Sequence, residues 1–114
     1  MRKIVNKLGR TRIPTVIQSE YRYCQTRRLT SVEYQTELNA KLVEGIREVR
    51  EASDRKAFTK ELADLREVLN TMMDFFKIDA AKIQALKVAK AQTHGRFKGR
   101  VFLEFTEDKD EPSA

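Results

Sequence analysis

Apolar residues recur at helical spacing through the middle of this chain. From Tyr34 to about Ala52 they fall at intervals of four, four and three residues, and a second set keeps a similar period from about Arg55 to Lys77. The first set is Leu38, Leu42, Ile46 and Val49, and the second is Phe58, Leu62, Leu65, Leu69, Met72, Met73 and Phe76. Both segments are therefore predicted to be amphipathic helices.

Polar residues suited to capping stand at the expected helix starts. Thr30-Ser31-Val32-Glu33 has the spacing of a capping box, and Ser53-Asp54 supplies cap residues for the second helix. Asp79 is expected to cap a third helix, from Ala80 to about His94, which Gly95 ends. Its residues expected to point inward, fully or in part, are Ile83, Leu86 and Val88.

The two ends of the chain have a different character. The Ile13-Pro14 step disfavours helix at Ile13, so a helical turn is expected to start at Pro14. Residues 21–29 alternate loosely and suggest an extended segment, and residues 97–105 suggest a short strand or an extended arm. We therefore expect an all-α fold, a helical hairpin plus a third helix, with short extended N- and C-terminal segments. One domain is expected over residues 1–105, followed by an acidic flexible tail over 106–114.

Composition narrows the classes of protein. A chain of 114 residues with 40% apolar content is enough for one domain with one core. No apolar run approaches the roughly 18 residues that span a bilayer, so we expect a soluble, cytoplasmic protein. Cys24 is the single cysteine and His94 the single histidine, which excludes an intrachain disulfide and zinc sites of the multi-cysteine type. Cys24 is expected to be a half-buried strand residue rather than a nucleophile.

The net charge of +6 favours a polyanionic partner, either a nucleic acid or the phosphates of a small nucleotide. Positive residues cluster in residues 22–28 and 82–100. Charge alone does not choose between the two partners.

Several acidic residues fall where a helical projection places apolar ones. On the second helix Glu61 lies inside the apolar arc and Asp64 on its edge. On the first helix Glu48 flanks the stripe, Gly45 lies between Glu48 and the centre of the stripe, and Glu44 faces out. Glu48 comes about six residues before the connection and Glu61 about seven after it, so an antiparallel hairpin brings them to one height. Asp64 follows one turn further along.

Three carboxylates converging on a helix interface repel one another unless something positive lies between them. The alternative to a metal site is that each carboxylate is solvated or paired with a Lys or Arg. A hard divalent cation explains all three together, because Mg²⁺ prefers oxygen ligands and keeps water positions that phosphate oxygens can take. Glu48, Glu61 and Asp64 are therefore the predicted metal ligands, for Mg²⁺ or for Mn²⁺ in its place.

At these residues the chain resembles the all-α nucleotide pyrophosphohydrolases of the MazG-like group, particularly the branch similar to phosphoribosyl-ATP pyrophosphohydrolase. The family pattern is E-E-x-x-E and then E-x-x-D, and here Glu44-Gly45-x-x-Glu48 precedes Glu61-x-x-Asp64 by twelve residues. NKLGRTRIP, at 6–14, resembles the N-K-L-V-R-D-K-I-P of that branch, and KAQTHGRF, at 90–97, resembles its K-x-x-x-R-G-G-F. The resemblance covers about residues 4 to 103 and implies a MazG-like bundle.

The activity that this resemblance implies is hydrolysis of a nucleoside triphosphate, or a similar nucleotide, between the α and β phosphates. The products are a monophosphate and pyrophosphate, and Glu48, Glu61 and Asp64 match both the catalytic acids and the metal ligands. The remaining ligand position holds Gly45, which removes one carboxylate. The other departures from the branch are Gly9 for Val, Thr11 for Asp, His94 for Arg and Arg96 for the second Gly. The basic residues expected to bind the substrate phosphates are Lys7, Arg10, Lys90 and Arg96.

Three functions remain as hypotheses. The first is the Mg²⁺-dependent pyrophosphohydrolase, and the second is a regulatory homologue that binds nucleotide but has lost catalysis through Gly45. The third, ranked well below, is a nucleic-acid module in which Tyr21 and Tyr23 stack among neighbouring arginines. Because a lone hairpin cannot cover the apolar arc of the second helix, we also expect a homo-oligomer, with a dimer completing a four-helix-like core.

Overall fold

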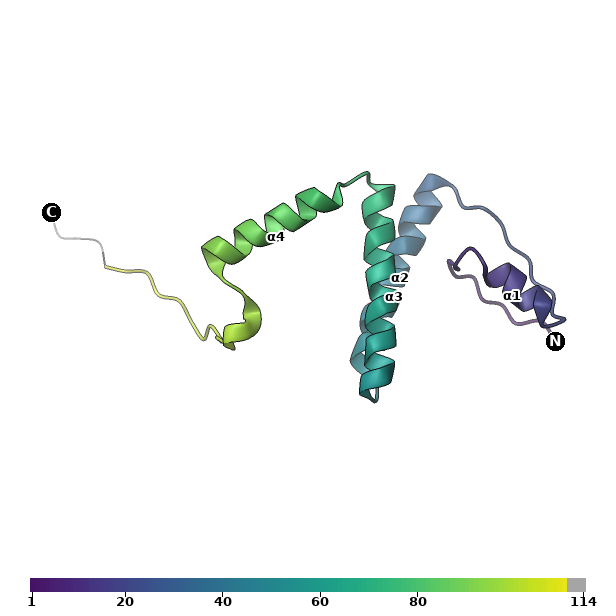
Figure 1. The fold of residues 1–114 in the computed structure, drawn as a ribbon, viewed down its shortest axis with the longest axis horizontal. Coiled ribbons are helices and arrows are strands. Elements are labelled where there is room, and N and C mark those ends of the chain that lie inside the picture. Colours follow the sequence, from purple (N-terminus) through teal and green to yellow (C-terminus); the bar gives the residue numbers. More distant parts are fainter. Residues whose placement is uncertain (111–114) are drawn as a thin grey trace. The chain divides into compact units, whose positions relative to one another are not determined.

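The protein is all-helical over residues 1–110, which are the residues that the computed structural model describes (Figure 1). Its helices are α1 (Ile13–Ser19), α2 (Ser31–Glu51), α3 (Arg55–Phe75) and α4 (Ala80–His94), followed by a 3₁₀ turn at Phe97–Gly99. The chain divides into two compact units, Met1–Ile78 and Asp79–Ala114, and each is described here by itself. The predicted all-α class is confirmed. Within the described residues no helix is both long enough and apolar enough to cross a membrane.

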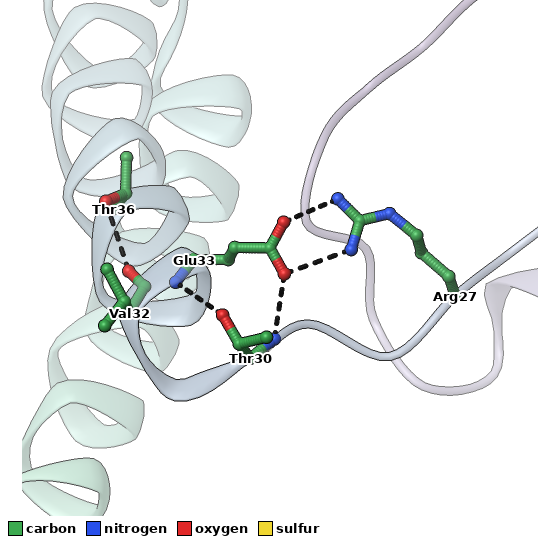
Figure 2. Close-up of polar contacts among 5 residues, drawn as sticks. All are labelled: Arg27, Thr30, Val32, Glu33 and Thr36. Atoms are coloured by element: carbon green, nitrogen blue, oxygen red, sulfur yellow. Dashed lines mark hydrogen bonds and ion pairs between the residues drawn. The ribbon is translucent and has the colours of Figure 1, made fainter.

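A complete capping box starts α2, as the sequence predicts (Figure 2). The Glu33 amide donates to the Thr30 hydroxyl at 3.2 Å, and the Thr30 amide donates to the Glu33 carboxylate at 3.0 Å. Arg27 adds two further hydrogen bonds to that carboxylate, at 3.1 and 2.7 Å. Two backbone amides that lack a partner within the helix are thus satisfied, so this end of α2 is fixed by local chemistry.

Helices α2 and α3 form an antiparallel hairpin and lie side by side along their length (Figure 1). The connection is short, and α3 begins at once because the Asp54 carboxylate accepts a hydrogen bond from the Ala57 amide at 2.7 Å. At the open end of the hairpin, Tyr34 meets Phe75 edge to face, with ring centroids 5.1 Å apart. This contact ties the start of α2 to the end of α3.

The hairpin covers little of its own apolar surface. Among the hydrophobic residues described, Leu38 on α2 is the one that is fully buried, at 2% exposure. Leu62 and Leu69, which the sequence places on the apolar arc of α3, are 43% and 46% exposed. The arc predicted from periodicity therefore exists, but these helices alone do not cover it.

Helix α1 begins one residue earlier than expected. It starts at Ile13, with Pro14 in its first turn, where a proline is tolerated because the amide it lacks would have no helical partner. The predicted extended segment at 21–29 begins in a turn at Tyr21, and residues 22–30 have neither helix nor strand. Cys24 is half-buried as expected, but it does not lie in a strand.

The unit that begins at Asp79 contains α4 with the bounds predicted from its caps. Asp79 accepts a hydrogen bond from the Ala81 amide at 2.9 Å, and Gly95, with φ of 80°, ends the helix. Of the three residues expected to point inward, fully or in part, Ile83 is partly buried, while Leu86 and Val88 are 60% and 40% exposed. Nothing within their own unit covers them.

The predicted strand over residues 97–105 does not form. A 3₁₀ turn occupies Phe97–Gly99, and residues 100–110 have neither helix nor strand. A strand needs a neighbour to satisfy its amides and carbonyls, and the described residues contain no other strand. The alternative expectation, an extended arm, fits better. Residues 106–110 of the predicted acidic tail are irregular, and positions 111–114 lie outside the described residues.

Candidate acidic site between helices α2 and α3

A cavity of about 650 Å³ opens along the α2–α3 hairpin, and acidic side chains line it. Glu48 comes from α2, and Glu61 and Asp64 come from α3. The structure thus brings the three predicted ligands to the wall of one cavity, in agreement with the height argument made from the short connection. The ligand role itself stays a prediction.

Glu48 is the acid at the centre of this group. Burial raises the pKa of the Glu48 carboxyl, and the neighbouring carboxyl groups of Glu61 and Glu44 raise it further. Within residues 1–110, Glu48 forms no ion pair with a Lys or Arg, so its charge is opposed by like charges and not balanced.

The other acids each have a cationic neighbour. Asp64 pairs with Arg10 at 2.9 Å, and Glu61 has the more distant Lys60 at 3.9 Å. The alternative to a metal site, in which every acid pairs with its own Lys or Arg, therefore holds for Asp64 and weakly for Glu61. It does not hold for Glu48.

The prediction that Glu44 faces outward is wrong. Its side chain is 22% exposed and lines the same cavity, with Lys7 at 3.5 Å and Lys41 at 3.8 Å. Burial acts to raise the pKa of Glu44, but Lys41 and Lys7 outweigh it, so the pKa is lowered. The helical projection failed here because the segment 8–11 also lines the cavity, and a projection of α2 alone does not contain that segment.

Gly45 has a packing role that the sequence did not reveal. It is buried, and a Cβ atom at this position would stand 3.1 Å from Leu65 Cδ1. That distance is shorter than ordinary van der Waals contact, so the glycine lets the α2 backbone approach Leu65 of α3. The sequence indicated only that Gly45 removes a carboxylate. The structure adds that it also allows close packing of the two helices.

The four predicted basic residues fall in different parts of the chain. Lys7 and Arg10 lie at the cavity, each paired with one of its acids. Lys90, on α4, and Arg96, just before the 3₁₀ turn, belong to the other unit and are exposed. A substrate-binding role for Lys90 and Arg96 stays a prediction.

The cavity offers the oxygen ligands that Mg²⁺ prefers, but not a complete ligand set. Within residues 1–110 no three acidic, histidine or cysteine side chains are gathered closely enough to hold a metal ion. Glu48 adjoins Glu61 and Glu44, while Asp64 is turned to Arg10. The donor chemistry fits a divalent cation, and the arrangement would have to contract around one.

Sequence reasoning missed several residues of this site. The largest group is the N-terminal segment with its side chains Leu8 and Thr11, and Lys41 and Lys60 were missed as well. Lys41 lies three residues before Glu44 on one helix face, which is a signal that the sequence did contain.

Comparison with protein-family models, curated proteins and solved structures found no match to the chain.

Proposed function

We propose that this chain is a Mg²⁺-dependent nucleotide pyrophosphohydrolase of the MazG-like group, in its phosphoribosyl-ATP pyrophosphohydrolase-like branch. It would cleave a nucleotide between the α and β phosphates to give a monophosphate and pyrophosphate. The observation that carries this function is Glu48, a carboxylate that pairs with no Lys or Arg of residues 1–110 and lies on a cavity wall with Glu61 and Asp64. A site that concentrates negative charge in this way is suited to a cation.

The residues that would hold the cation are Glu48, Glu61 and Asp64. When bound, Mg²⁺ polarises the phosphate oxygens and helps to generate the attacking hydroxide. The carboxylates would contribute the charge and orientation of the site. Lys7 and Arg10, which pair with the cavity acids Glu44 and Asp64, would bind the phosphate oxygens.

Gly45 supports a second function, nucleotide binding without catalysis. The family pattern has a glutamate ligand at this position, and the glycine of this chain has no side chain to offer. The neighbouring Glu44 lines the cavity but is already paired with Lys7 and Lys41, so it does not replace the missing ligand freely. Such a protein would act as a sensor or regulatory partner.

Turnover separates the two functions. Purified protein is incubated with a panel of nucleoside triphosphates and related nucleotides, with Mg²⁺, with Mn²⁺ or with EDTA, and released pyrophosphate is measured. Metal-dependent release from one or more nucleotides supports the hydrolase. Binding by calorimetry without release, together with release by the Gly45→Glu variant, supports the regulatory alternative. Neither binding nor release would remove both.

Matched variants assign the activity to this cavity. Glu48→Gln and Glu61→Gln keep side-chain size and remove the charge, and each should lower turnover by more than the roughly 10- to 100-fold lost with an outer-shell partner. Glu51→Gln makes the same change at an exposed position at the end of α2, outside the cavity, and should leave turnover unchanged.

We further propose that the protein is a cytoplasmic homodimer. The apolar arc of α3 is exposed at Leu62 and Leu69, and Ile46 on α2 is 46% exposed. A second hairpin packed on this surface would complete a four-helix core.

A further inference from the structure

The N-terminal segment of residues 7–11 runs along the acidic cavity and contributes cations to it. Leu8, Arg10 and Thr11 line the cavity, and Leu8 is half-buried there. Lys7 Nζ lies 3.5 Å from Glu44 Oε2, and Arg10 Nη2 donates to Asp64 Oδ1 at 2.9 Å. Two residues of one short segment thus neutralise acids on both helices of the hairpin.

The ion pairs of Lys7 and Arg10 can exchange partners easily. The side chains of Arg10 and Asp64 are 61% and 42% exposed, and Lys7 is 54% exposed. Ion pairs this open to water are weak, because solvent screens them and two long side chains must be held in one geometry. Residues 1–10 have no helix or strand to hold them, so the segment depends on these pairs, on Leu8 and on its junction with α1.

A divalent cation at the cavity competes with Arg10 for the same carboxylate. Arg10 contacts the Oδ1 atom of Asp64. A doubly charged ion that binds this carboxylate is its stronger partner and withdraws charge from the Arg10 pair, so the pair is weakened. The released Arg10 guanidinium then becomes a donor for an anion, and a guanidinium binds phosphate oxygens in a bidentate fashion.

We propose that residues 7–11 form a cationic strap that exchanges partners. In the absence of ligand Lys7 and Arg10 neutralise Glu44 and Asp64, and with a divalent cation bound to Asp64 the Arg10 guanidinium turns to a polyphosphate anion in the same cavity. The inference rests on the proposed function, because it takes the cavity to be a cation site. The strap would make binding of the cation and of the polyphosphate cooperative. By thermodynamic linkage, each ligand would then raise the affinity for the other by the same factor.

The strap predicts opposite effects of one substitution on the two ligands. Arg10→Gln removes the competitor for Asp64, so Mn²⁺ alone should bind more tightly, by up to about fivefold for an exposed pair. The same variant lacks the guanidinium for the anion, so tripolyphosphate in the presence of Mn²⁺ should bind roughly tenfold more weakly. A residue that only supports the fold would weaken both.

Calorimetric and relaxation titrations of the intact chain test this. Mn²⁺ binding is followed by water proton relaxation, and tripolyphosphate binding by calorimetry with Mn²⁺ in excess, after correction for their association in buffer. Arg12→Gln is the matched control, since Arg12 is an exposed arginine outside the acidic cavity. It should behave as the wild type. In an Asp64→Asn background, Arg10→Gln should no longer improve Mn²⁺ binding.

The outcomes separate the strap from the proposed function. Tighter Mn²⁺ binding with weaker tripolyphosphate binding in Arg10→Gln supports the strap. Mn²⁺ binding that is unchanged or weakened in Arg10→Gln overturns the strap and leaves the cation site standing. If neither the wild type nor Arg10→Gln binds Mn²⁺, both the cation site and the strap are overturned.

Discussion

Gly45 of α2 backs directly onto Leu65 of α3, and a Cβ at Gly45 would stand 3.1 Å from Leu65 Cδ1. The atom it would meet is the end of a flexible side chain, and Leu65 is only half-buried, so it has room to move by a few tenths of an ångström. The remaining contacts of that Cβ, at 3.8 and 3.9 Å, are ordinary. The contact therefore restrains residue 45 without forbidding a methyl group.

We expect Gly45→Ala to raise the free energy of unfolding by up to about 1 kcal/mol, because alanine is the better helix former and Leu65 can shift. Urea denaturation of both proteins measures this difference. A loss of stability instead would mean that Leu65 is held rigidly and that close approach of the two helices determines the choice of glycine.

Gly45→Glu and Gly45→Gln differ in charge but hardly in size, so their comparison isolates the carboxylate that the family pattern would place at this position. We expect the glutamate variant to bind Mn²⁺ more tightly than the glutamine variant, since it adds an oxygen ligand of full charge beside Glu48. Equal Mn²⁺ affinities would show that a side chain from residue 45 does not reach the cation.

Glu48 should make the metal-free protein less stable as pH rises. Its pKa is raised in the folded state, first by burial and then by Glu61 and Glu44. The folded state then holds this proton more tightly than the unfolded state, so the contribution is present below the unfolded pKa and is lost as pH rises through the folded one. Glu48→Gln removes this component.

The measurement is the free energy of unfolding of the wild type and of Glu48→Gln from about pH 4 to about pH 8 in EDTA. The wild type should lose stability relative to the variant across that range. Addition of Mg²⁺ should reverse the trend at neutral pH if the cation site is correct. A difference that does not vary with pH would contradict the arrangement of carboxyl groups described above.

Glu33 should have the opposite pH dependence. Hydrogen bonding to Arg27 and to the Thr30 amide lowers the pKa of Glu33 from 4.5 to about 2. The stability that it contributes is therefore present above about pH 4.5 and is lost as pH falls toward 2. Glu33→Gln should flatten this acid limb of the stability profile, and an unchanged limb would show that other carboxyl groups dominate it.

The hydroxyl of Thr30 should be worth about 1 kcal/mol, because Thr30→Ala leaves the Glu33 amide without its cap. Thr36→Ala is the control within the same helix. The Thr36 hydroxyl donates to the Val32 carbonyl at 3.2 Å (Figure 2). That carbonyl already accepts a backbone hydrogen bond within the helix, so loss of the hydroxyl should not destabilise α2. Equal destabilisation by the two substitutions would contradict the capping argument.

Leu69→Lys should shift the proposed dimer toward monomer. Leu69 is 46% exposed on the apolar arc of α3, and a charge there opposes burial against a second hairpin. Asn70→Lys introduces the same charge at the neighbouring, exposed position and should leave the mass unchanged. Light scattering measures both variants, and a wild type that is monomeric at micromolar concentration would contradict the dimer.

The sequence by itself determined the helices of this protein. The capping box at Thr30, Asp54 before α3 and Asp79 before α4 are interactions between residues two or three positions apart, so the pattern of residues contains all the information they need. The bounds of α4 followed from its caps alone. The acids of α3 were found for a similar reason, because a polar residue on an apolar arc is visible without a structure.

The tertiary structure decided what surrounds those acids. Glu44 lines the cavity, Arg10 takes Asp64, and Gly45 meets Leu65, and each of these depends on segments that are distant in sequence. A helical projection contains one helix and no neighbour, so it cannot show which flank another segment covers. Local periodicity therefore fixed which residues could form the site, and the packing of segments against one another fixed which of them lie together.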